Sequence, residues 1–249
     1  VRANRLLVKA GHEPVPIRQF QRMVKRELTA RQQVLIREGS AAASRYTLYL
    51  ERRELARGLC LEADHKQANV LVQKPRGRGE DNLIRPWITV YIETFSRAIA
   101  GICISLRPTQ AEVLSALGAA MSRNPELSPA YGVPDILRVD NGTEFTADSV
   151  IETAGSVDTV VVHTPPYTPN KKGKIEKWNR TSKNELFADM PFFTSGPTRK
   201  DGSLQLGKAV EAYPFELFVA EVLEFVRFYN YERPHEGEGM NGMTPAEKW

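Results

Sequence analysis

The sequence predicts an α/β fold in which helices flank a mixed five-stranded sheet, preceded by a basic helical arm. From residue 59 onward, short β-rich apolar runs alternate with segments of helical periodicity. The chain of 249 residues is 41% hydrophobic and 26% charged, which suits a domain with a sizeable core. Residues 1–58 hold 13 Lys or Arg against 5 Asp or Glu, whereas the whole chain carries a net charge of only +4.

The N-terminal segment, residues 1–58, is predicted to form two short helices and a linker. Pro14 and Pro16 precede the helices, and Gly39 follows them. The first helix carries four cations, as a helix that binds nucleic acid would, although a solvated helix face has the same composition. These predicted DNA contacts are Arg18, Arg22, Lys25 and Arg26.

The main domain, residues 59–249, begins with three predicted strands. A short apolar run ends at Asp64, and β-rich runs follow over 87–92 and 99–104, which favours an antiparallel meander. The Gly- and Arg-rich segment 74–81 is expected to form a mobile loop.

Helices and two further strands complete the main domain. A capping box from Thr109 to Glu112 begins a helix that should end near Asn124. The other expected elements are strands over 135–139 and 159–163, a short helix between them, and helices over 173–188 and from Pro214 onward. The order βββαβαβα is the ribonuclease H-like arrangement.

Three acids occupy positions that this arrangement could bring together. Asp64 ends the first strand, Asp140 follows the fourth, and Glu176 lies in the first turn of a later helix. Hard cations such as Mg²⁺ prefer carboxylate oxygens, and two such ions would assist both oxygens of a phosphoryl displacement. Taken singly, an Asp at a strand end is more often a turn or capping residue.

The segment around the second acid resembles a known family. Residues 140–145, Asp-Asn-Gly-Thr-Glu-Phe, are similar to the D-N-G-x-E-F motif of DDE transposases and retroviral integrases. Thirty-five residues separate Asp140 from Glu176, as in the D,D-35-E signature. Segments 166–176, 229–235 and 244–246 are similar to the active-site loop of the family and to elements downstream of bacterial catalytic cores.

The resemblance covers residues 59–249 and implies an enzyme that cleaves DNA strands and transfers them to a target. It implies Asp64, Asp140 and Glu176 as catalytic and metal-binding residues, with two Mg²⁺ or Mn²⁺ ions in the active complex. The implied partners are DNA, both element ends and target, and further copies of the chain in a homo-oligomer on DNA. The basic arm is similar to the tail end of the DNA-binding region of phage Mu-type transposases, and we interpret it as a remnant of that region.

Several residues near the acids are predicted to contact DNA. Arg180 and Lys183 follow Glu176 by four and seven residues and therefore share its helix face, where relatives use basic residues to grip the DNA end. A merely solvated face is the alternative. Lys66 replaces the Thr or Ser that many relatives have two positions after the first acid. The further predicted contacts are Lys66, Tyr167, Lys171, Lys172 and Lys174.

The remaining expectations concern alternatives and location. A ribonuclease H-like nuclease that only hydrolyses, or a catalytically silent DNA-binding assembly subunit, would retain many of the same residues. The sequence contains no apolar run of membrane-spanning length, so we expect a cytoplasmic protein without a membrane partner. Cys60 and Cys103 are expected to be reduced, and His65, His163 and His235 are expected to be structural.

Overall fold

The chain divides into two compact units, Val1–Arg52 and Arg53–Trp249. The computed structural model describes residues 2–28, 30–38, 56–75, 82–139, 142, 145, 148–164, 173–190, 193–194 and 213–249.

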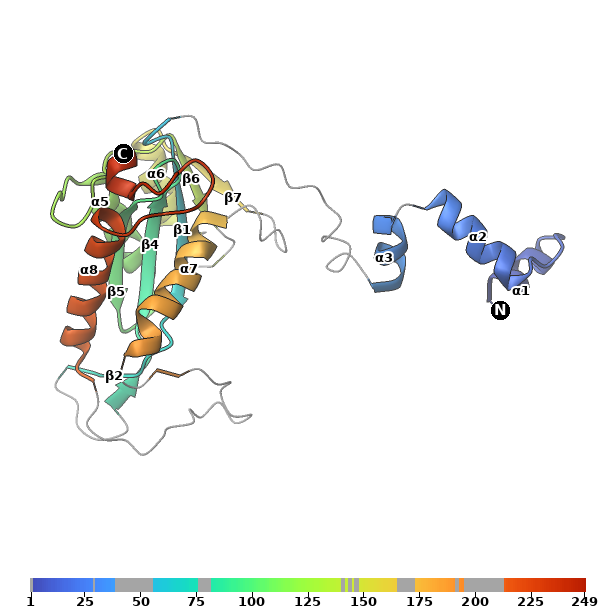
Figure 1. Ribbon diagram of the computed structural model, residues 1–249, viewed down its shortest axis with the longest axis horizontal. Helices are drawn as coiled ribbons and strands as arrows, with labels where there is room; N and C mark the ends of the chain where they lie inside the picture. The colour runs from blue at the N-terminus through green and yellow to red at the C-terminus, as the bar shows by residue number, and fades with distance from the viewer. Residues whose placement is uncertain are drawn as a thin grey trace. The chain divides into compact units, whose positions relative to one another are not determined.

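The first unit contains three helices, α1 (Arg2–Lys9), α2 (Ile17–Glu27) and α3 (Ala30–Glu38) (Figure 1). Two of them were predicted and α1 was missed. The Asn4 side chain both donates to the Val15 carbonyl and accepts from the Val15 amide, at 2.9 and 3.0 Å, and so ties α1 to the start of α2. None of the residues of α2 is buried, and Ile17 is 70% exposed. The apolar side chains of α2 therefore stay at least partly exposed in the described part of this unit.

The second unit is built on the predicted mixed five-stranded sheet, in the order β5-β4-β1-β6-β7 (Figure 1). Neighbours β1, β4 and β5 pair antiparallel, whereas β6 runs parallel to both β1 and β7. The strands are β1 (Cys60–Gln67), β4 (Trp87–Glu93), β5 (Ile99–Ser105), β6 (Ile136–Val139) and β7 (Val160–His163).

One detail of the strand prediction was wrong, and one pair of short strands was missed. Asp64 does not end β1, because the ladder with β4 continues to the pair Gln67↔Trp87. A second, two-stranded sheet joins β2 (Val72–Gln73) to β3 (Leu83–Ile84) beside the segment predicted as a loop. Two-residue strands are too short to show a periodicity in the sequence. Residues 76–81 of the predicted mobile loop lie outside the described residues.

The predicted helices are present, with ends that shift by a few residues. Thr109 caps the first of them by accepting from the Ala111 amide, and the helix ends at Met121 rather than near Asn124. The helices are α5 (Gln110–Met121), α6 (Asp148–Ser156), α7 (Gly173–Glu185), α8 (Phe215–Tyr231) and α9 (Pro245–Lys248), with a 3-10 turn, η4, at Phe187–Asp189. Among the described helices, none is both long and apolar enough to cross a bilayer.

The sheet separates two apolar cores. Leu61 and Ala63 of β1 pack in the core that includes α5 and α6, whereas Trp178 of α7 and Phe225 of α8 belong to the other core. Because successive strand residues point to opposite faces, Glu62 and Asp64 face the side of the sheet that α7 covers. This alternation brings two acids of β1 towards α7.

Candidate active site

Asp64 lies beside the helix face that carries Glu176. The Asn179 side-chain amide donates to Asp64 Oδ2 over 2.6 Å, and Asp64 is half-buried between β1 and α7. Asn179 follows Glu176 by three residues, so the two side chains share one face of α7. Glu176 itself is exposed. Asp64 thus contacts α7 at the residue three positions after Glu176, and a shared site of the two acids stays a prediction.

Asp140 lies outside the described residues, but β6, the strand that leads to it, is described and lies next to β1. Strand β6 pairs in parallel with β1 through Glu62↔Arg138 and ends at Val139. The carboxyl ends of parallel neighbours lie at one edge of a sheet. Within the described ranges, no three His, Cys, Asp or Glu side chains are grouped to hold a metal ion. The three-acid site stays a prediction, because one of its members is not among those residues.

The basic side chains near Asp64 come from β1 and α7. Lys66 is half-buried, and its ammonium group donates to the Asn179 carbonyl over 3.3 Å. Burial lowers the pKa of Lys66 to about 8, with Asp64 opposing that shift and Lys183 adding to it. Arg180 and Lys183 are exposed on α7, and their contact with DNA stays a prediction.

The other DNA contacts predicted in this region are only partly visible. Lys174 is half-buried in the first turn of α7. Tyr167, Lys171 and Lys172 lie outside the described residues, so their contact with DNA stays a prediction.

Glu62 and Arg138 form a buried ion pair that the sequence analysis missed. The residues are register partners on β1 and β6, and Arg138 Nη1 lies 3.0 Å from Glu62 Oε1. The other carboxylate oxygen of Glu62 accepts from the Ile175 amide of α7 at 3.2 Å. Each of these strand residues stands two positions before a predicted metal ligand. This spacing could have pointed to Glu62 and Arg138, because residues two positions apart in a strand lie on the same face of the sheet.

The histidines agree in part with the prediction of structural roles. His65 stacks on Trp87 with ring centroids 4.8 Å apart, and its Nδ1 lies 2.6 Å from Thr89 Oγ1. His235 is 2% exposed and packs edge-on against Tyr229 at 4.6 Å. His163 is exposed on β7, and its role stays a prediction.

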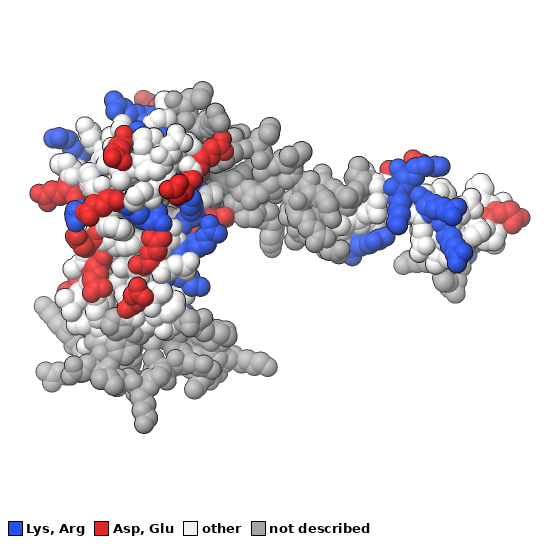
Figure 2. All heavy atoms as spheres, in the orientation of Figure 1, with Lys and Arg blue, Asp and Glu red and all other residues white. Residues whose placement is uncertain are grey.

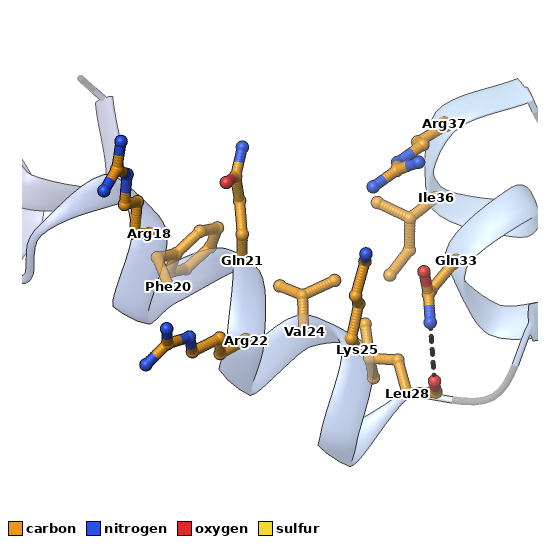
Figure 3. Close-up of a pocket in the computed structure, with 10 residues that line it drawn as sticks. All are labelled: Arg18, Phe20, Gln21, Arg22, Val24, Lys25, Leu28, Gln33, Ile36 and Arg37. Carbon is orange, nitrogen blue, oxygen red and sulfur yellow. Dashed lines mark hydrogen bonds between the residues drawn. The ribbon is translucent and has the colours of Figure 1, made fainter.

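The basic arm holds a groove between α2 and α3 with a volume of about 600 Å³ (Figure 3). Val24 and Lys25 extend from α2 towards Ile36 and Arg37 of α3, so apolar and basic side chains mix along it. Its lining contains no acid among the described residues: Arg18, Phe20, Gln21, Arg22, Val24, Lys25, Leu28, Gln33, Ile36 and Arg37.

The visible faces of the two units differ in charge (Figure 2). Lys and Arg dominate the described part of the arm, whereas both signs occur on the second unit. Arg26 pairs with Glu27 at 2.7 Å, and the other predicted arm contacts line the groove. DNA binding by the arm stays a prediction.

A mixed sheet of this order, with a helix carrying an acid packed beside a second acid on the central strand, defines a ribonuclease H-like domain of the transposase and integrase class. The chain belongs to the family described as the TnsB C-terminal domain, which matches residues 62–191. This membership confirms the resemblance to DDE transposases that the motif around residue 140 indicated.

A relative with a known role is the transposase for transposon Tn552 of Staphylococcus aureus. The two sequences are 27% identical over 143 residues, which is 56% of this chain but 29% of the relative. The chain thus spans less than a third of the length of that transposase.

Solved structures show the same fold. A chain of the simian T-cell lymphotropic virus intasome, in complex with PP2A regulatory subunit B56 gamma, has a TM-score of 0.53 and 17% identity, with 79% of this chain and 56% of that chain covered. The HTLV-2 integrase catalytic core domain, in complex with magnesium, has a TM-score of 0.50 and 16% identity, with 79% and 99% covered. At such low identity these similarities establish the fold alone.

Proposed function

We propose that this chain carries the catalytic domain of a DDE transposase, which cleaves DNA strands and transfers them to a target. The observation that carries the proposal is the hydrogen bond from Asn179 to Asp64, which brings β1 against the face of α7 that bears Glu176. Family membership and the relationship to the Tn552 transposase support the same reaction class.

The residues present suit a divalent metal ion. Asp64 and Glu176 offer only carboxylate oxygens, the ligands that Mg²⁺ and Mn²⁺ favour, and Asp140 is the proposed third ligand. The HTLV-2 integrase core was solved in complex with magnesium, which supports the assignment. Two such ions, when bound, would polarise the attacking and leaving oxygens of the phosphodiester.

The remaining side chains are assigned to DNA. Arg180 and Lys183 would neutralise backbone phosphates that the nearby carboxylates repel, and Lys66 adds a third cation on the neighbouring strand. The arm would add contacts through Arg18, Arg22, Lys25 and Arg26. Element ends and target are the proposed DNA partners. An assembly of several copies on DNA is also proposed, and the trimeric form of the HTLV-2 core supports it.

The test is a combined nicking and joining assay with labelled element-end DNA and Mg²⁺ or Mn²⁺. We expect strand-transfer products when a pre-cut end and a target duplex are supplied. Cleavage without any joined product would instead identify a nuclease that only hydrolyses. A shift of DNA in a gel with no cleavage under either metal would identify a DNA-binding assembly subunit.

A further inference from the structure

We propose that Glu62 is a positioning residue that holds the three acid-bearing segments in register, a role that rests on the proposed function. The Glu62 latch is defined as the Glu62 carboxylate, the Arg138 guanidinium and the Ile175 backbone amide. It joins β1, β6 and α7, the elements that carry or lead to Asp64, Asp140 and Glu176.

The geometry of the latch uses both oxygens of one carboxylate. Oε1 lies 3.0 Å from Arg138 Nη1, and Oε2 accepts from the Ile175 amide at 3.2 Å. Glu62 is 2% exposed, and the Arg138 side chain is 12% exposed. A charge-assisted contact at such low exposure has little freedom to move, because solvent cannot replace either partner.

The contact with α7 falls at the beginning of the helix. Ile175 is the third residue of α7, and the first amides of a helix have no acceptor within the helix itself. A carboxylate at this end is also favoured by the helix dipole. Glu62 therefore acts as a cap supplied by the central strand, and it fixes the first turn of α7 against β1.

Stability alone does not explain the choice of an ion pair here. A buried ion pair is often no more stable than a well-packed apolar pair of similar volume. The pair does specify geometry, because the two oxygens of one carboxylate contact two different elements at defined points. Since Ile175 precedes Glu176 directly and Glu62 precedes Asp64 by two residues on one strand face, the latch sets how these two acids lie relative to each other. Misplacement by about 1 Å can cost on the order of 100-fold in rate.

The experiment compares two double variants that differ in the acceptor offered to Ile175. Glu62→Gln with Arg138→Gln keeps an oxygen for the amide and a neutral hydrogen-bonded pair, whereas Glu62→Met with Arg138→Met is wholly apolar. Amide-resolved hydrogen exchange is measured without metal or DNA, and cleavage is measured separately. We expect the Met pair to raise exchange at Ile175 selectively, with core amides of β4 unchanged. We expect cleavage to fall about 10- to 100-fold relative to the Gln pair.

The outcomes separate the latch from the proposed function. Equal exchange at Ile175 in both double variants would overturn the latch, whatever the activity. An inactive parent that still shows the exchange difference would overturn the proposed function and leave the latch in place.

A measurement on the parent covers the case in which the Met pair does not fold. Ile175 should exchange more slowly than Leu217, which occupies the same third position in α8. Equal exchange rates at the two amides would also overturn the latch.

Discussion

Helix α7 presents a buried face and an exposed face, and different physical effects determine the side chains of each. Ile175, Trp178 and Ser182 are at most 2% exposed. The Trp178 ring packs edge-on against Tyr229 of α8, with ring centroids 4.8 Å apart, and its centroid lies 5.8 Å from that of Phe225. On the other face, Glu176, Arg180 and Lys183 are all exposed. These residues alternate along the same 13 positions.

The comparison shows how one short helix can serve both the fold and the proposed chemistry. Close packing determines the side chains of the buried face, because they are almost entirely removed from water. The exposed face carries charged groups of both signs at the surface, where ions and phosphates could reach them. The latch from Glu62 joins the two, because it fixes the backbone one residue before Glu176.

The largest expected effect is the loss of DNA cleavage when an acid of the proposed site, such as Glu176 on the exposed face of α7, is replaced. Glu176→Gln should reduce metal-dependent DNA cleavage by on the order of 1000-fold or more, because it removes a charged ligand from a carboxylate site. Asp64→Asn and Asp140→Asn should do the same, with unchanged melting temperatures. Glu216→Gln, an exposed first-turn acid of α8, is the matched control and should cleave normally. Full activity in any one acid variant would remove that residue from the site.

The buried face should respond in stability. Trp178→Ala should lower the free energy of unfolding by about 3–5 kcal/mol, because a large cavity opens between α7 and α8. Urea denaturation gives the value, and Trp178→Phe should lose much less. An alanine variant as stable as the parent would contradict the division of α7 into two faces.

A smaller effect is expected for the two cations of the exposed face. Replacing Arg180 and Lys183 by Ala should weaken DNA binding and reduce the steepness of its salt dependence by roughly two phosphate contacts. The control replaces Arg107 and Arg123, two exposed cations next to α5, which packs on the opposite face of the sheet. Binding titrations at several salt concentrations measure both. Identical salt slopes for the two double variants would mean that the α7 face is merely solvated.

The smallest expected effect is a loss of stability below neutral pH that is caused by His235. Burial lowers the pKa of His235 to about 4, aided by the neighbouring Arg233, and Nε2 of the ring is buried without a hydrogen-bond partner in the described part of the chain. Unfolded histidine titrates near 6.5, so the unfolded chain binds the extra proton between about pH 6.5 and 4. Stability should therefore be lost as the pH falls through that window.

His235→Phe isolates this contribution, because it keeps a ring against Tyr229 and removes the titration. The stability difference between parent and variant, measured by denaturation from pH 7.5 to 4, should shift against the parent as the pH falls. A difference that does not change with pH would show that His235 is protonated equally in both states.

Much of the fold could be predicted from the sequence, because its elements have strong local patterns. Strands were predicted from the β-rich runs around Val90 and Ile102, and a helix was predicted from the apolar stripe of α8. Helix α1 and the pair β2 and β3 could not be predicted in this way. Asn4 bonds to a residue eleven positions away, and two-residue strands exist only through their partners.

The sequence by itself determined the family, the identity and spacing of the three acids, and the shared face of Glu176, Arg180 and Lys183. Motif spacing and helical period are local properties, so they can be recognised in the sequence without knowing the fold. Only the tertiary structure decided that Asn179 reaches Asp64 and that Glu62 is an internal partner for Arg138 and Ile175. Those contacts join residues 76 to 115 positions apart in the sequence. The sequence shows that a residue is an acid, but only its burial and its partners in the folded chain show whether it bonds internally or can bind a ligand.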